Sequence, residues 1–359
     1  MKDRFDEVME RFLVPISEYE GPVMDSTYFL RKDGSFVFAE GYCHPPGAFW
    51  GMIIKYPLPG GHIDIFGREY GWTHRVIVDG ELAIISPEQQ VENQFKVDPG
   101  LRGRQGVKPV FARNFVRFPL SDFIGYFDAR HSMKELRKEH EWIDTAVRKT
   151  CRLLNWNPEQ TGVTGSLAYG KVEDDIDLVF IGTPEENAGV ARTIRSYRAI
   201  HPEARVFELG KEWPLRFYYA GTLICPFFRY SAPEYIPLLQ CEMEAEEEGV
   251  ALEATVSDDI HNLYLPAIVG LTDLKREDGR PEEDLDLIIY NGALRGELWR
   301  GDRIRLRSVI VRVTTSQTGT FRAALVIGDR QVEKIKSLDL TRKEIHDKKM
   351  EVEDDYYQY

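Results

Sequence analysis

Short apolar runs between Gly- and Pro-containing turns are the feature that most constrains the first third of this chain. The turns read D-G-S, P-P-G, L-P-G-G and V-D-G-E, and the runs between them are too short for helices. They predict a β-rich N-terminal domain over residues 1–125, with a helix within residues 1–20. The predicted strands are Tyr28–Arg31, Ser35–Glu40, Trp50–Tyr56, His62–Phe66, His74–Val78 and Glu81–Ile85.

The pattern becomes helical from His131 to Trp156, where apolar residues recur at helical spacing until Asn157-Pro158. Strand, turn, strand, helix, strand and a β-hairpin turned by Ala220-Gly221 should follow. This order predicts a mixed-sheet α/β core over residues 126–235.

Strand-like runs return in the last third of the chain, where G-D-R-I-R-L-R-S-V alternates between polar and apolar residues. We expect a small β-barrel of the OB type over residues 250–336. The acidic segment 231–260 is expected to be a helix or a linker, and residues 337–359 a charged tail, helical at first. The predicted fold class is therefore a multidomain α+β protein.

Charge and cysteine content limit the function classes. The 359 residues carry a formal net charge of −13, which argues against a dedicated DNA-binding protein. An acidic protein can still bind a nucleoside triphosphate when metal ions lie between the two. The four cysteines form no C-x-x-C pair, so we expect reduced thiols and a cytoplasmic location. No apolar run approaches the ~20 residues that span a bilayer, which predicts a soluble protein without membrane contact.

The segment Gly165–Phe180 carries the strongest chemical signal. Its sequence is G-S-L-A-Y-G-K-V-E-D-D-I-D-L-V-F. Gly165 allows close approach of a phosphate to the backbone, and Ser166 adds a hydroxyl donor at the start of a helical turn. Asp175 and Asp177 lie two apart on the following strand, so their carboxylates share one face. Two carboxylates beside a phosphate-binding turn favour the binding of Mg²⁺ or Mn²⁺ and phosphoryl transfer. The alternative interpretation is that the two aspartates lie at a surface position between strand and turn and bind no metal.

These sixteen residues resemble the nucleotidyltransferase superfamily that includes DNA polymerase β, in which G-S on a turn precedes D-h-D-h on a strand. The fold-level resemblance covers residues 131–230. The run F-V-F-A-E-G-Y-C-H-P-P-G also resembles an uncharacterised archaeal group of predicted nucleotidyltransferases. The resemblance implies that Gly165 and Ser166 bind the triphosphate of an NTP such as ATP. It also implies that Asp175 and Asp177 hold metal and that NMP passes to an acceptor. The flanking domains could present an RNA end, a protein side chain or a small metabolite as that acceptor.

The chain departs from the family pattern at two positions that matter for catalysis. Tyr169 stands where the family often has Arg, and Lys171 is the expected substitute for that nucleotide-binding cation. Cys225 stands where a third carboxylate is expected, and Glu208 is the nearest alternative as third ligand or catalytic base. If Glu208 cannot reach the pair, the chain is instead a catalytically lapsed nucleotide-binding protein whose barrel binds RNA or a protein partner.

Other patterns each have two interpretations. One set of residues in the N-terminal domain is either a metal site or a group of independent surface residues: His44, His62, Asp64 and His74. The stripe Arg303, Arg305 and Arg307 is either a single-stranded nucleic-acid groove or an outer face paired with acids. The basic segment Leu101–Phe118 either contacts a polyanion or is a solvated connector. Aromatic residues of the hairpin either stack on a base or belong to the core.

Overall fold

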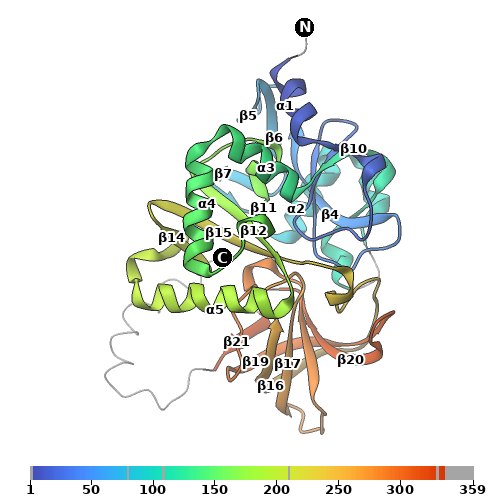
Figure 1. Ribbon diagram of the computed structural model, residues 1–359. Coiled ribbons are helices and arrows are strands. Elements are labelled where there is room, and N and C mark those ends of the chain that lie inside the picture. The colour runs from blue at the N-terminus through green and yellow to red at the C-terminus, as the bar shows by residue number, and fades with distance from the viewer. Residues whose placement is uncertain (1–2, 79–80, 107–109, 209–210, 329–330, 336–359) are drawn as a thin grey trace.

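The computed structural model describes residues 3–78, 81–106, 110–208, 211–328 and 331–335, and the predicted charged tail lies outside them (Figure 1). Within the described residues the chain is a mixed α/β protein. Its strands form an eight-stranded sheet, a five-stranded sheet, a six-stranded sheet and a separate hairpin. The three larger sheets follow one another along the chain, and the hairpin lies within the segment that forms the first of them.

The first sheet is built from the N-terminal segment, and helices cover both of its faces. Its strand order is β1-β10-β2-β3-β4-β6-β5, with β9 paired to β4. Phe29 packs with α2 on one face, whereas its neighbour Leu30 packs with α1 on the other. Each predicted strand of this region overlaps an observed one, but α2 was not predicted. The bounds are α1 Arg4–Phe12, β1 Val14–Pro15, β2 Tyr28–Arg31, β3 Phe36–Ala39, β4 Ala48–Pro57, β5 Ile63–Ile65, β6 Arg68–Trp72, α2 Pro87–Val97, β9 Val116–Pro119 and β10 Phe123–Phe127, with β7 Arg75–Val78 and β8 Glu81–Ile84 as the hairpin.

The second sheet forms the core of the molecule and has the order β11-β12-β15-β14-β13. β12 runs antiparallel to β11 and parallel to β15. The predicted single helix is two helices that meet at His140, and the predicted hairpin turn has Ala220 and Gly221 in left-handed backbone conformations. The bounds are α3 Ala129–Glu139, α4 Glu141–Leu154, β11 Thr161–Val163, β12 Asp175–Gly182, α5 Pro184–Ile200, β13 Arg205–Glu208, β14 Lys211–Tyr219 and β15 Thr222–Tyr230.

The third sheet lies on the opposite side of α5 from α4 (Figure 1). Its order is β16-β17-β18-β20-β19-β21, and β16 pairs with β19 as well as with β17. The prediction of a helix or linker over the acidic segment is wrong, because residues 242–261 form strand β16. Buried Val250, Leu252 and Ala254 alternate there with more exposed side chains, as in a half-buried strand. The bounds are β16 Glu242–His261, β17 Ala267–Arg276, β18 Leu285–Ile289, β19 Arg303–Thr315, β20 Gly319–Val326 and β21 Val332–Lys334.

A disulfide joins the first and third parts of the chain. Cys43 and Cys241 are bonded, with their Cα atoms 5.7 Å apart, although 198 positions separate them in the sequence. The prediction of four reduced thiols is therefore wrong for this pair, whose proximity arises only from tertiary packing. Cys151 and Cys225 are free and buried. No helix in the described part of the chain is long and apolar enough to cross a membrane.

Candidate metal and phosphate site

Asp175 and Asp177 point to the same face of β12, as predicted from their spacing. Ile176 and Leu178 point to the other face, where they are buried under the helices. The parallel register with β15 places Cys225 directly opposite Asp177. The carboxylate oxygens of the two aspartates and the Sγ of Cys225 all lie within 4.8 Å of one another. No other set of three His, Cys, Asp or Glu residues in the described ranges comes together in this way.

The Gly-Ser turn lies in direct contact with this pair. The N–H of Thr164 donates a hydrogen bond to the carbonyl of Asp177 over 3.0 Å, which fixes the start of the 3₁₀ turn Gly165–Tyr169. Gly165 has φ +64°, and a Cβ atom there would lie 1.8 Å from Oδ2 of Asp177. Only glycine fits this position, because any side chain would occupy the space of the carboxylate. The structure therefore brings Gly165, Ser166 and both aspartates into one site.

Burial and mutual repulsion shape the electrostatics of the pair. Burial first, and then the charge of Asp175, raise the pKa of Asp177 to about 7, while Arg216 opposes this rise. Burial also raises the pKa of the Cys225 thiol, which stays protonated and donates to Oδ2 of Asp175 over 3.5 Å. Two crowded carboxylates suit a hard divalent cation, whereas a neutral thiol is a poor ligand for Mg²⁺. Asp175 and Asp177 are thus the residues that would hold such an ion.

The raised pKa of Asp177 predicts a pH dependence of stability. The folded state holds a proton on Asp177 up to about pH 7, whereas the unfolded chain loses it near the ordinary value of 3.8. Because the folded state binds more protons between these values, this group destabilises the fold progressively as pH rises from 4 to 7. We expect Asp177→Asn to be more stable than wild type at pH 8 by roughly 2–4 kcal/mol and equal to it at pH 4. Urea unfolding in EDTA at several pH values measures this difference, and a constant difference across the range would contradict it.

Basic side chains surround the pair. Lys55 reaches in from β4 of the first sheet, where its ammonium group donates a hydrogen bond to the hydroxyl of Tyr169. Burial lowers the pKa of Lys55 to about 8, and the nearby Glu173 opposes this shift. Arg75 of the β7–β8 hairpin and Arg216 of β14 both stabilise the ionised form of Asp177. Sequence reasoning missed Lys55 because nothing local links β4 to the Gly-Ser turn.

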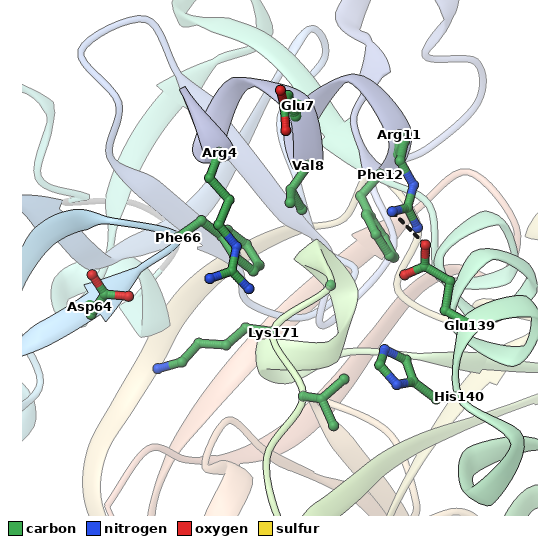
Figure 2. Close-up of a pocket in the computed structure, with 12 residues that line it drawn as sticks. Arg4, Glu7, Val8, Arg11, Phe12, Asp64, Phe66, Glu139, His140 and Lys171 are labelled. Atoms are coloured by element: carbon green, nitrogen blue, oxygen red, sulfur yellow. Dashed lines mark ion pairs between the residues drawn. The ribbon is translucent and has the colours of Figure 1, made fainter. Parts of the chain in front are cut away.

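The two remaining predicted residues, Lys171 and Glu208, are each paired with a side chain of opposite charge. Lys171 pairs with Glu173 over 3.2 Å and lines a pocket of about 600 Å³ between α1, the α3–α4 junction and residues 170–172. Figure 2 shows Arg4 and Lys171 extending toward this pocket from opposite walls. Glu208 accepts a hydrogen bond from Arg216, which lies beside Cys225 across the β14–β15 pairing. Glu208 does not belong to the group of ligand atoms that lie within 4.8 Å of one another at Asp175 and Asp177.

The other candidate residues lie outside this site. His44 and His74 are largely buried, and burial lowers the pKa of each to about 3. Arg303, Arg305 and Arg307 share an exposed face of β19, where Arg305 pairs with Glu253 over 2.6 Å. In the basic segment, Arg102 pairs with Glu92 and Arg104 with Asp122, as expected for a solvated connector. Three hairpin aromatics, Phe217, Phe228 and Tyr230, are buried in the core, whereas Tyr218 is 45% exposed.

No family model, curated protein or solved structure matches this chain.

Proposed function

We propose that the chain is a metal-dependent nucleotidyltransferase that transfers NMP from an NTP to an acceptor. The observation that carries this proposal is the contact between Gly165 and the Asp177 carboxylate. It brings the Gly-Ser turn next to the two carboxylates, which supports the binding of a metal-bound triphosphate at this point. The surrounding Lys55, Arg75 and Arg216 add positive charge where the triphosphate would lie.

In the proposed reaction an acceptor oxygen attacks the α-phosphorus, the bond from that phosphorus to the bridging oxygen breaks, and pyrophosphate leaves. A bound Mg²⁺ or Mn²⁺ would neutralise charge on the transferring phosphate. Gly165 and Ser166 would orient the β- and γ-phosphates through backbone N–H groups and the Ser166 hydroxyl. Glu208 is the candidate base that would take the proton from the attacking oxygen of the substrate. The hydrogen bond that Glu208 accepts from Arg216 would have to break or shift for this role.

A nucleotide-binding protein without catalysis is the second candidate. The neutral Cys225 thiol in place of a third carboxylate favours it. Under either proposed function, the third sheet is the part of the chain that we expect to contact a partner. β16 pairs with both β17 and β19, and β18 runs parallel to β20, pairings that support the proposal of a small domain of the OB type. We propose that this sheet contacts an RNA or protein acceptor. A cytoplasmic location, as predicted, would be unusual for a protein with the Cys43–Cys241 disulfide.

Asp177→Asn tests the proposal. We expect wild type to show a thermal shift that requires both an NTP and Mg²⁺ or Mn²⁺, and the variant to lose it because the metal loses a charged ligand. Glu244→Gln on exposed β16 is the matched control and should keep the shift. Pyrophosphate release with RNA and protein acceptors separates turnover from binding. A wild-type protein that binds no nucleotide with either metal would overturn the proposal, and binding without release would favour the second candidate.

A further inference from the structure

Four ionisable side chains are buried together where the three sheets meet. Asp25 and Glu40 come from loops flanking β2 and β3, Arg229 from β15, and Arg295 from the loop between β18 and β19. Asp25 is 1% exposed and Arg229 is 6% exposed, while the Arg295 side chain is 13% exposed. Such buried charges are costly unless each has a partner of opposite sign.

The two guanidinium groups lack most of the partners that such burial demands. The Arg229 side chain makes no hydrogen bond and no ion pair with any described residue, and its Nε is buried. Nη1 of Arg295 lies 3.4 Å from Oδ2 of Asp25, but neither its Nε nor its Nη1 donates a hydrogen bond. The hydroxyl of Tyr42, which feels the charges of Asp25 and of both arginines, is buried and unbonded as well. Three protein segments therefore present unused donors at one junction.

The acids of this cluster do not balance the arginines. Both carboxylate oxygens of Asp25 are already hydrogen-bonded, one to the N–H of Gly41 over 2.8 Å and the other to the hydroxyl of Ser26 over 2.9 Å. Burial, and then repulsion from Asp25, raise the pKa of Glu40 to about 8, so Glu40 is mostly neutral at pH 7. Two positive charges thus face one negative charge in a water-poor region, and the excess favours an anion.

The cluster lies on the same face of the second sheet, the core sheet, as Asp175 and Asp177, which we call the metal pair. Side chains alternate along β15, so Cys225, Phe227 and Arg229 all project toward this face. The Arg295 guanidinium lies over the Phe227 ring, 5.4 Å from its centre, and Phe227 is one two-residue repeat, roughly 7 Å, from Cys225. A hydrogen bond also connects the cluster to the Gly-Ser turn. The hydroxyl of Thr164, the residue before Gly165, donates to the carbonyl of Ser26, the residue after Asp25, over 2.6 Å.

We propose that Arg229, Arg295 and Tyr42 form an oxyanion-binding subsite that holds a phosphate group of the substrate on the same face of the core sheet as Asp175 and Asp177. Arginine suits this role because its fork of donors matches phosphate oxygens, and the buried setting strengthens each bond. The identity of the phosphate rests on the proposed function. It belongs either to the NTP or to a phosphorylated acceptor, and both sources present the same chemistry to the three donors.

Arg229→Met and Arg295→Met test the subsite, with inorganic phosphate as the probe in metal-free buffer. We expect phosphate to raise the melting temperature of wild type and to bind each variant at least tenfold more weakly. Arg303→Met on the exposed face of β19 is the matched control and should bind phosphate as wild type does. Without phosphate, Arg229→Met should melt at a higher temperature than wild type, because it removes an unpaired buried charge. A merely structural arginine would give the opposite change.

Should Arg295→Met fail to fold, Arg295→Lys keeps the charge but loses the fork, and we expect it to bind phosphate more weakly than wild type. Equal phosphate stabilisation of wild type and of the folded arginine variants would overturn the subsite. So would the absence of any phosphate effect on wild type at millimolar concentrations.

The metal-free buffer separates this subsite from the proposed function. Phosphate binding there requires neither metal nor NTP, so a failed nucleotide assay leaves the phosphate result interpretable. If wild type does bind ATP with Mg²⁺, competition by phosphate assigns the subsite to the NTP. Simultaneous binding of both assigns it to the acceptor.

Discussion

Gly165→Ala should abolish metal-dependent nucleotide binding and destabilise the fold. The new Cβ would lie 1.8 Å from Oδ2 of Asp177, and the backbone φ of +64° is a conformation that alanine adopts at a cost. Either the turn or the carboxylate must move, and both are parts of the same site. We expect a loss of roughly 2–4 kcal/mol in the free energy of unfolding and at least tenfold weaker Mn²⁺ binding. Urea unfolding and metal titration measure the two effects separately.

Gly221→Ala is the control for backbone strain alone. Gly221 also has a left-handed backbone, with φ +84°, but a Cβ there would meet no atom within 4 Å. This variant should lose only about 1 kcal/mol and should bind metal as wild type does. If Gly165→Ala and Gly221→Ala lost the same unfolding free energy and bound Mn²⁺ equally well, the turn and the carboxylate would not be in contact in solution. That result would contradict the proposed site, which depends on this contact.

Features set by neighbouring residues were predictable from the sequence. The D-I-D alternation determines which face of β12 carries the carboxylates, and the Gly-Ser step places the turn beside them. The Ala220-Gly221 hairpin follows from the same kind of local constraint. Helix α2 could also have been predicted, because Ser86 and Gln89 form a capping box with Pro87 at the first helical position.

Features set by distant residues were not predictable. Lys55 reaches the site only because the first sheet packs against the core, and Cys43 meets Cys241 for a similar reason. The β16 prediction failed because a run of glutamates concealed the alternation of buried residues that makes a strand. The position of Cys225 relative to Asp177 depends on the parallel register of β12 and β15, which sequence spacing does not specify.

Cys225→Asp should convert the pair into a three-carboxylate site. Cys225 is 1% exposed, and its Sγ lies within 4.8 Å of the ligand oxygens of Asp175 and Asp177. Without metal, a third carboxylate in this buried position repels the other two, so we expect a loss of roughly 2–4 kcal/mol in unfolding free energy at pH 8. Mn²⁺ should recover most of that loss and bind at least tenfold more tightly than to wild type, because hard cations favour additional oxygen ligands.

Cys225→Asn separates charge from shape, since asparagine matches aspartate in size but cannot ionise. It should bind Mn²⁺ no more tightly than wild type, and its stability should vary with pH less than that of Cys225→Asp. If the protein is a nucleotidyltransferase limited by its missing carboxylate, pyrophosphate release should also rise in Cys225→Asp and not in Cys225→Asn. Equal Mn²⁺ affinity in the two variants would show that position 225 does not reach the ion. The absence of a third carboxylate at position 225 would then not bear on whether this chain is an enzyme.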